Sequence, residues 1–402
     1  MSDEGLGKKH LRNYKPSELF KEKYGFTVDD KTFCIMPFIH TSTTTNGDFR
    51  LCCRSTRVWD IQNIPLRDLW NHRKYKTVRN NLKEGVRDSH CNACWKMEDK
   101  GITSLRQSQN YERTETYAHL VDTYHRTEVL PWNIPIVEFK LSNLCNLKCR
   151  MCGPTDSSAW YDDWIELTGS NEFKDTSGII TINKTEKGYD VPQFDWYNYE
   201  PFWTQLEKNM HNIEHVYFAG GEPMLIERHY DFLERCVEAD AAKNMIIEYN
   251  TNMSTLPTRV LNLWTKFKQV RIGASIDGME AVLEYQRNPA KWDKTLYNLN
   301  KVDALPSNII SWLAFTVTAY NVLHMIDFMK WKLTVSNFKR INSSNRRPVI
   351  TYHVAHHPKH LNIRVLPNEF KKTVTEQFAE FLTWIEENNF NEHVNKHAKE
   401  IV

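Results

Sequence analysis

The segment LSNLCNLKCRMCGP, residues 141–154, places Cys145, Cys149 and Cys152 with three and then two residues between them. It overlaps the end of an alternating apolar segment, residues 135–142, which predicts a β-strand. Three thiolates this close can hold three irons of a 4Fe–4S cluster, which normally has four cysteine ligands. The fourth iron would then be open to a substrate or cofactor. The alternatives are a chance triplet or zinc, although zinc favours two C-x2-C pairs or added histidines.

From residue 134 onward, strand and helix patterns alternate. Strands are expected at 135–142, 213–219, 245–251, 269–276, 309–318 and 349–355, and amphipathic helices at 225–240, 256–267, 291–304 and 322–335. Six such units predict a parallel sheet with helices outside it. The strands have one apolar and one polar face, whereas a closed eight-stranded barrel fills its interior with Val, Ile and Leu. We therefore expect an open, partial (β/α)6 TIM-type barrel lined for a polar ligand, with a solvated antiparallel sheet as the alternative.

The remaining chain divides into segments around this barrel. We expect an N-terminal arm at 1–30, a cysteine-bearing α+β module with a helical connector at 31–128, the barrel at 129–366 and a helical tail at 367–402. Within the module, Asn46-Gly47 predicts a hairpin and residues 66–84 a helix. The barrel carries an insertion at 167–202, with a possible hairpin at 179–191 and an aromatic cluster at 194–199. Such an insertion is either a lid or a segment packed onto the barrel.

Composition narrows the class of protein. The 402 residues carry a formal charge of only +2, with both signs interspersed, which does not indicate a general nucleic-acid or polybasic membrane surface. The first residues contain no apolar run typical of a secretory signal, and the most apolar segment, 309–322, is too short to span a bilayer. We expect a cytoplasmic protein without a membrane partner. In a reducing compartment, grouped cysteines favour metal or redox sites, while the isolated Cys236 fits a small buried hydrophobe.

Two further motifs extend the pattern around the cysteine triplet. Residues 220–223 (GGEP) follow the second predicted strand, and residues 274–278 (ASIDG) end the fourth. With the triplet, they resemble the radical S-adenosylmethionine superfamily, although Met151 stands where many members have an aromatic residue. The resemblance implies that Gly220, Gly221, Glu222 and Pro223 receive the methionine amino group of the cofactor and that Ser275 and Asp277 bind its ribose. It places Asn250, Asn252 and Arg287 where members contact the cofactor carboxylate or substrate. For these last five residues, capping or structural hydrogen bonding is the alternative.

The same resemblance implies the chemistry. A cluster held by Cys145, Cys149 and Cys152 would pass one electron to S-adenosylmethionine, and the resulting 5′-deoxyadenosyl radical would remove a hydrogen atom from the substrate. A flavodoxin- or ferredoxin-type protein would donate the electron.

A second cysteine set precedes the barrel. Cys34, Gly47 and Cys52, followed by the pair Cys91 and Cys94, resemble the twitch or SPASM modules that hold an auxiliary cluster. The resemblance implies a second 4Fe–4S cluster with four cysteine ligands that transfers electrons. Structural zinc is the alternative, and Cys53 competes with Cys52 as a ligand. In characterised relatives this module follows the barrel, whereas here it precedes it.

These patterns lead to three functional hypotheses. The first is a radical enzyme acting on a peptide or protein side chain, and the second is the same chemistry on a small polar substrate such as a sugar alcohol. The third is a zinc and iron–sulfur scaffold without turnover, against which the GGEP and ASIDG segments argue. A histidine group near the end of the barrel favours a substrate-contact or loop role over a metal site. Its members are His353, His356, His357 and His360.

Overall fold

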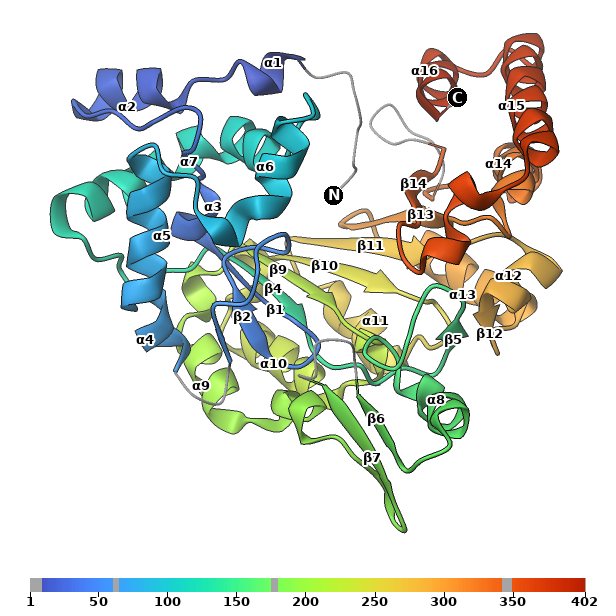
Figure 1. Cartoon of the computed structure of the whole chain (residues 1–402), viewed down its shortest axis with the longest axis horizontal. Helices are drawn as coiled ribbons and strands as arrows, with labels where there is room; N and C mark the ends of the chain where they lie inside the picture. Colours follow the sequence, from blue (N-terminus) through green and yellow to red (C-terminus); the bar gives the residue numbers. More distant parts are fainter. Residues whose placement is uncertain (1–8, 61–64, 175–179, 342–348, 402) are drawn as a thin grey trace.

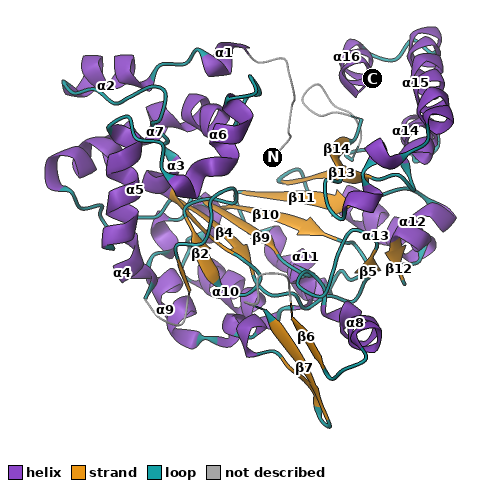
Figure 2. Cartoon of the chain, viewed as in Figure 1, coloured by secondary structure: helices purple, strands orange, loops and turns teal. Residues whose placement is uncertain are grey.

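A nine-stranded sheet organises the chain (Figures 1 and 2). The computed structural model describes residues 9–60, 65–174, 180–341 and 349–401. The start of the predicted arm and the first residue of the predicted 179–191 hairpin lie outside these ranges. The spatial order is β14-β13-β11-β10-β9-β4-β1-β2-β3, and the seven strands from β14 to β1 are paired in parallel. Their bounds are β1 His40–Thr43, β2 Asp48–Arg50, β3 Trp59–Asp60, β4 Ile136–Lys140, β9 His215–Ala219, β10 Ile246–Thr251, β11 Gln269–Ser275, β13 Ile309–Val317 and β14 Thr351–Val354.

The predicted α/β class and the six barrel strands are confirmed. Helices connect these strands and pack against the apolar face of the sheet, whose buried side chains include Ile247, Ile272 and Leu313. They are α9 Glu200–Lys208, α10 Glu227–Glu238, α11 Thr258–Trp264, α12 Glu280–Gln286, α13 Trp292–Asp303 and α14 Met325–Thr334. The tail forms α15 Asn368–Glu387 and α16 Glu392–Ile401. None of the described helices is long and apolar enough to cross a bilayer.

The N-terminal module joins the barrel through its own strand. β1 pairs with β4 in parallel, and the turn at Gly47, which has a positive φ of 80°, returns the chain into β2. The helix expected at 66–84 is wrong in one respect, because it is broken at His72. The backbone of His72 is extended, and its side chain accepts from the Lys74 amide, so a second helix begins there. The module's helices are α1 Lys9–Arg12, α2 Pro16–Tyr24, α3 Met36–Ile39, α4 Leu66–Trp70, α5 Arg73–Lys83, α6 Asn92–Glu98 and α7 Leu105–Thr127.

The insertion packs onto the barrel. After α8 (Tyr161–Thr168) it forms a small sheet of β6 Glu172–Lys174, β7 Thr181–Thr185 and β8 Gly188–Asp190. Phe194 and Trp196 of the aromatic cluster are buried. The Trp196 indole donates to the Thr45 carbonyl at 3.0 Å, and Ser142 donates to the Phe194 carbonyl at 3.0 Å. Of the two readings of the insertion, these contacts support packing.

The register of the strands stacks the polar side chains of the sheet in layers. One layer contains Ser42, Glu138, Tyr217, Glu248 and Arg271, which are consecutive partners across five strands. The next layer toward the carboxyl ends begins with Lys140 and includes Asn250. Paired residues share a face of the sheet, so these side chains lie on the face opposite the helices. The inner face of the partial barrel is therefore polar, as the alternation predicts.

Candidate functional site

The cysteine triplet lies at the carboxyl ends of the parallel strands, beside a cavity of about 390 Å³. Cys145 and Cys152 are partly exposed, whereas Cys149 is buried in the two-residue strand β5 (Lys148–Cys149). β5 pairs with β12 (Arg287–Asn288), which fixes the loop against the segment that carries Arg287. The cavity is lined by Lys140, Cys145, Leu147, Cys149, Met151, Cys152, Asp156, Ser157, Tyr217, Ala219, Gly220, Gly221, Asn250, Thr251, Asn252, Ser275 and Arg287. The triplet and several predicted cofactor contacts therefore share one space.

The two glycines of the GGEP segment let its backbone pack against the cysteine loop. A Cβ on Gly221 would lie 2.2 Å from the Leu144 carbonyl oxygen, and one on Gly220 would lie 2.7 Å from that of Ser142. The amide of Gly221 donates to the Ser142 carbonyl at 2.7 Å, and the amide of Glu222 donates to that of Leu144 at 2.8 Å. A side chain at either glycine would displace the loop that carries Cys145.

Glu222 does not line the cavity but hydrogen-bonds to two residues that do, Thr251 and Asn252. Its carboxylate is buried and accepts from the Thr251 hydroxyl at 2.8 Å, the Asn252 amide at 2.7 Å and the Met224 amide at 3.1 Å. Burial raises the pKa of Glu222 to about 7, against the lowering effect of these hydrogen bonds. Neither Glu222 nor Pro223 lines the cavity, so their predicted cofactor contact stays a prediction.

A buried ion pair lies under the triplet. Arg287 Nε lies 2.7 Å from Asp277 Oδ2, and Arg287 Nη1 donates to Cys149 Sγ at 3.7 Å. The other Asp277 oxygen accepts from the Thr316 amide at 2.7 Å. A hydrogen bond from Cys152, followed by the charge of Arg287, lowers the pKa of Cys149 despite its burial. Arg287 thus reaches the cavity and a cluster cysteine, whereas Asp277 is fully buried beneath it.

Asn250 and Asn252, predicted at the end of the third strand, both line the cavity, and Asn252 also contacts the cysteine loop. Asn252 Nδ2 donates to Asn146 Oδ1 at 3.1 Å and lies 3.8 Å from Cys145 Sγ. The exposed Asn250 and the partly exposed Ser275 line the cavity. They are therefore available to a bound molecule.

The four cysteines predicted for the auxiliary site converge in the N-terminal module. Cys34, Cys52, Cys91 and Cys94 surround one small space, together with Met36, Arg54, Ser55, Leu105 and Arg106. Burial, and then the neighbouring thiols, raises the pKa of Cys34, Cys52 and Cys91.

Cys53 lies apart from this set. Burial, and then the nearby Glu138 carboxylate, raises the pKa of its thiol to about 12, and Arg54 and Lys140 counter that effect. Glu138 and Lys140 belong to the polar inner face of the barrel. The structure therefore separates the neighbouring cysteines: Cys52 joins the auxiliary set, and Cys53 faces the barrel interior.

The comparison with protein families bears on this module. Residues 34–95 match the family SPASM, described as an iron–sulfur cluster-binding domain. The matched segment begins at Cys34 and includes all four converging cysteines. No curated protein matches the chain.

Several solved structures are similar to this chain. Native anSMEcpe with bound AdoMet and Kp18Cys peptide is 16% identical, with a TM-score of 0.40 over 63% of this chain and 62% of that one. Streptococcus suis SuiB bound to the precursor peptide SuiA is 13% identical, with a TM-score of 0.37 over 77% and 62%. TYW1 with a lysine-pyruvate adduct is 11% identical, with a TM-score of 0.31 over 61% and 70%. The matched part is less than two thirds of the anSMEcpe and SuiB chains.

The sequence motifs did not predict several residues of the site. Lys140 and Tyr217 line the cavity, and Glu138 lies one layer below Lys140 on the same strand. The sequence does show alternating apolar and polar residues at 136–140 and 215–219. This alternation predicts that the polar side chains share one face of each strand, but it does not predict which of them contact one another across strands. The exposed His356, His357 and His360 follow β14, and the His353 ring lies 5.7 Å from that of His356.

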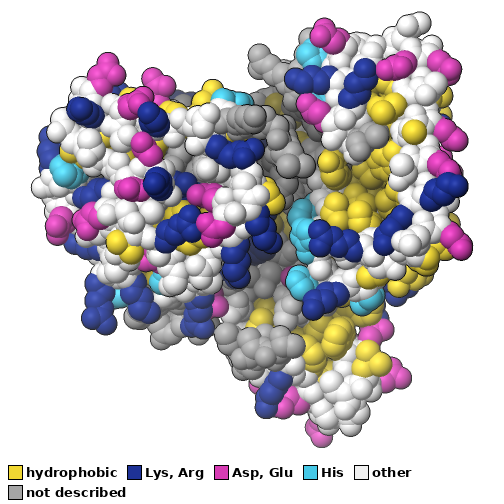
Figure 3. All heavy atoms as spheres, turned by 45° about the horizontal axis from the view of Figure 1, so that its top comes forward, with side chains coloured by type: hydrophobic (Ala, Val, Ile, Leu, Met, Phe, Trp, Pro, Cys, Tyr) yellow, Lys and Arg dark blue, Asp and Glu magenta, His cyan; other side chains and the backbone are white. Residues whose placement is uncertain are grey.

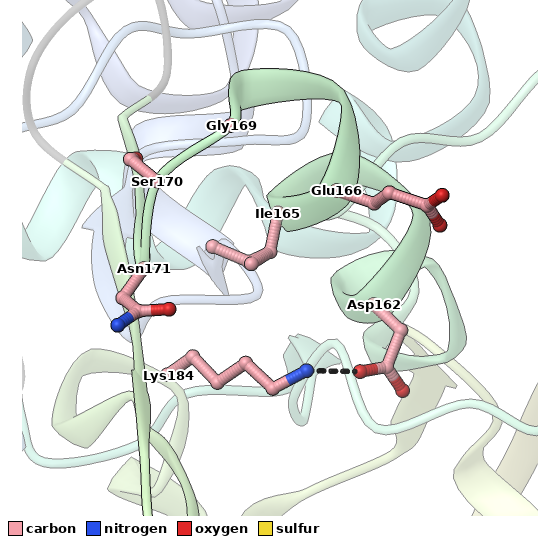
Figure 4. A pocket seen from close by; sticks show the side chains of 7 residues that line it. All are labelled: Asp162, Ile165, Glu166, Gly169, Ser170, Asn171 and Lys184. Carbon is pink, nitrogen blue, oxygen red and sulfur yellow. Dashed lines mark hydrogen bonds and ion pairs between the residues drawn. The ribbon is translucent and has the colours of Figure 1, made fainter.

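The surface is hollowed between the N-terminal module and the C-terminal helices, with Lys, Arg and His side chains along the edges (Figure 3). A separate, shallow pocket lies on the insertion between α8 and β7 (Figure 4). There Lys184 Nζ pairs with Asp162 Oδ1 at 3.1 Å across the opening. That pocket contains no cysteine and lies outside the site described above.

Proposed function

We propose that this chain is a radical S-adenosylmethionine enzyme with two 4Fe–4S clusters. The observation that carries the proposal is the arrangement of Cys145, Cys149 and Cys152 around an open polar cavity. Three cysteines leave one iron of a cubane without a protein ligand, and the cavity beside them has room for a cofactor. When bound there, the cluster and S-adenosylmethionine supply a 5′-deoxyadenosyl radical that takes a hydrogen atom from the substrate.

The residues around the cavity hold and orient these groups. Gly220 and Gly221 keep the second loop against the cysteine loop, while Asn250 and Ser275 offer polar contacts to S-adenosylmethionine. Arg287 places a positive charge beside Cys149, which stabilises its thiolate form. Glu222 holds Thr251 and Asn252 at the rim.

The second site supports a role in electron transfer. Cys34, Cys52, Cys91 and Cys94 would ligate all four irons, which leaves no open iron for a substrate. The segment that contains them matches an iron–sulfur cluster-binding family. We propose that it exchanges electrons with the barrel and that a flavodoxin- or ferredoxin-type protein reduces the enzyme.

For the substrate, we propose a peptide or protein side chain. The N-terminal module of this chain resembles the SPASM modules found in enzymes that act on peptides. A small polar substrate is the second candidate. It is favoured by the polar layer of Glu138, Tyr217 and Glu248 beside the cavity.

Metal analysis of the anaerobically reconstituted chain tests the two-cluster proposal. We expect about eight irons per chain, and about four after the triple substitution of Cys145, Cys149 and Cys152 by alanine. About four irons with one zinc in the unsubstituted chain would overturn the auxiliary cluster. Deuterium transfer from a labelled candidate peptide into 5′-deoxyadenosine would then identify the substrate class.

A further inference from the structure

The inner face of the barrel contains a buried acid–base pair that no motif predicted. It consists of His40, on β1 of the N-terminal module, and Glu138, on β4 of the barrel. The two side chains are 3% and 8% exposed. Their atoms His40 Nε2 and Glu138 Oε2 lie 3.5 Å apart.

The hydrogen bonding of His40 fixes the protonation of its ring. His40 Nδ1 lies 3.1 Å from the Leu51 carbonyl oxygen, which can only accept, so Nδ1 carries a proton. An unprotonated Nε2 facing an ionised carboxylate would bring two electron-rich atoms together. A proton bound between the two atoms relieves this repulsion, so the pair is a place where a proton can be held.

The pair connects the auxiliary cysteines with the cavity. On one side, the acceptor residue Leu51 directly precedes Cys52 in the chain. On the other side, Glu138 is the register partner of Tyr217, which lines the cavity. The Ser42 hydroxyl in the same layer is buried and has no hydrogen-bond partner within the described residues.

Other titratable groups face the pair from the surrounding elements. Cys53 approaches from the loop after β2, Lys140 from the next layer of β4, Tyr217 from β9 and, beyond it, Glu248 from β10. Glu248 has its own partners, His215 at 3.1 Å and Arg271 at 3.8 Å. It belongs to the same layer as Glu138 but stands two strands farther from β1.

We propose that the His40–Glu138 pair is a proton site coupled to the auxiliary cluster, so that the pair gains one proton when the cluster gains one electron. The inference rests on the proposed function. In turnover, a substrate radical of the form •C–XH, where X is a heteroatom, would lose one electron to the auxiliary cluster and one proton to the pair, forming C=X. Glu138 accepts that proton, and His40 acts as a positioning residue.

An electron added close to the pair makes protonation more favourable, so the reduced form holds the proton more tightly. Reduction is then easier at low pH. Within the pH range in which reduction brings a proton to the pair, the potential falls by up to about 59 mV for each tenfold decrease in proton concentration. Outside this window it is constant.

Redox titration of the reconstituted full chain, monitored by EPR between pH 6 and pH 9 without substrate, tests the proposal. We expect the auxiliary potential to fall with rising pH in the unsubstituted chain and to lose this dependence in Glu138→Gln. His40→Asn keeps a donor for the Leu51 carbonyl but loses contact with Glu138, so it should shift the pH range in which the potential changes. The matched control Glu248→Gln should retain the dependence.

Iron content, measured on every variant, separates lost coupling from a lost cluster. A pH-independent potential in the unsubstituted chain, or an unchanged slope in Glu138→Gln, would overturn the inference while leaving the two-cluster proposal intact. Absence of a second cluster signal from the unsubstituted chain would overturn the auxiliary assignment, and this inference with it.

Discussion

The guanidinium of Arg287 lies between a carboxylate and a cluster cysteine: its Nε is 2.7 Å from Asp277 Oδ2, and its Nη1 is 3.7 Å from Cys149 Sγ. Asp277 is fully buried and Arg287 is 8% exposed. The side chain that sequence resemblance assigns to cofactor binding therefore also neutralises a buried charge.

Replacing Arg287 should destabilise the fold as well as the site. In Arg287→Met the Asp277 carboxylate stays buried without its partner, which typically costs about 3–5 kcal/mol. Urea unfolding of the anaerobic protein measures this loss. The double variant Arg287→Met, Asp277→Asn should recover part of it, and a double variant as unstable as the single one would contradict the assignment.

The same contact predicts a change in redox behaviour. Arg287→Gln removes a positive charge beside Cys149, which should make the potential of the cluster at the triplet more negative. EPR-monitored titration measures this potential. An unchanged or more positive potential in a variant with full iron content would show that the guanidinium does not act on this cluster.

The sequence predicted the six strands of the barrel and the motifs at its mouth, because a strand followed by a chemical motif leaves a local signature. It did not predict that Asp277 and Glu222 lie beneath the cavity, since alternation identifies a face but not the depth of each side chain. The pairing of β1 with β4 was also invisible, because a four-residue strand carries too little pattern to reveal its partner. The Glu138–His40 contact depends on that pairing.

The choice between Cys52 and Cys53 can be tested by substitution. Cys52→Ser should lose about four irons per chain, because its thiol belongs to the converging set, while Cys53→Ser should retain them. Iron and sulfide analysis after identical reconstitution gives the result. Loss of iron in Cys53→Ser alone would reverse the assignment.

Because Gly221 packs closely against the cysteine loop, adding a single methyl group at this position should disrupt the cluster site. In Gly221→Ala the new Cβ would meet the Leu144 backbone at 2.2 Å, so the loop must move and the cluster at the triplet should be lost. Gly153→Ala is a matched control in the same region, because its Cβ would have no neighbour within 4 Å. Equal iron contents in the two variants would argue against this packing.

Glu222 should make stability depend on pH. Its pKa is raised from 4.5 to about 7, so the folded chain binds a proton more tightly than the unfolded chain. The stabilisation is complete below about pH 4.5 and is lost as pH rises to about 7, by about 3 kcal/mol in all. Urea unfolding at pH 5 and pH 8 should show this difference shrinking in Glu222→Gln. An equal difference in both proteins would assign the pH dependence to other groups.

The central claim is that the cavity beside Cys145, Cys149 and Cys152 supports radical cleavage of S-adenosylmethionine. The most direct measurement is the yield of 5′-deoxyadenosine from the reconstituted chain under anaerobic dithionite reduction. We predict formation of 5′-deoxyadenosine and methionine by the unsubstituted chain and none by Cys149→Ala. A fully iron-loaded, reduced chain that never yields 5′-deoxyadenosine would contradict the account.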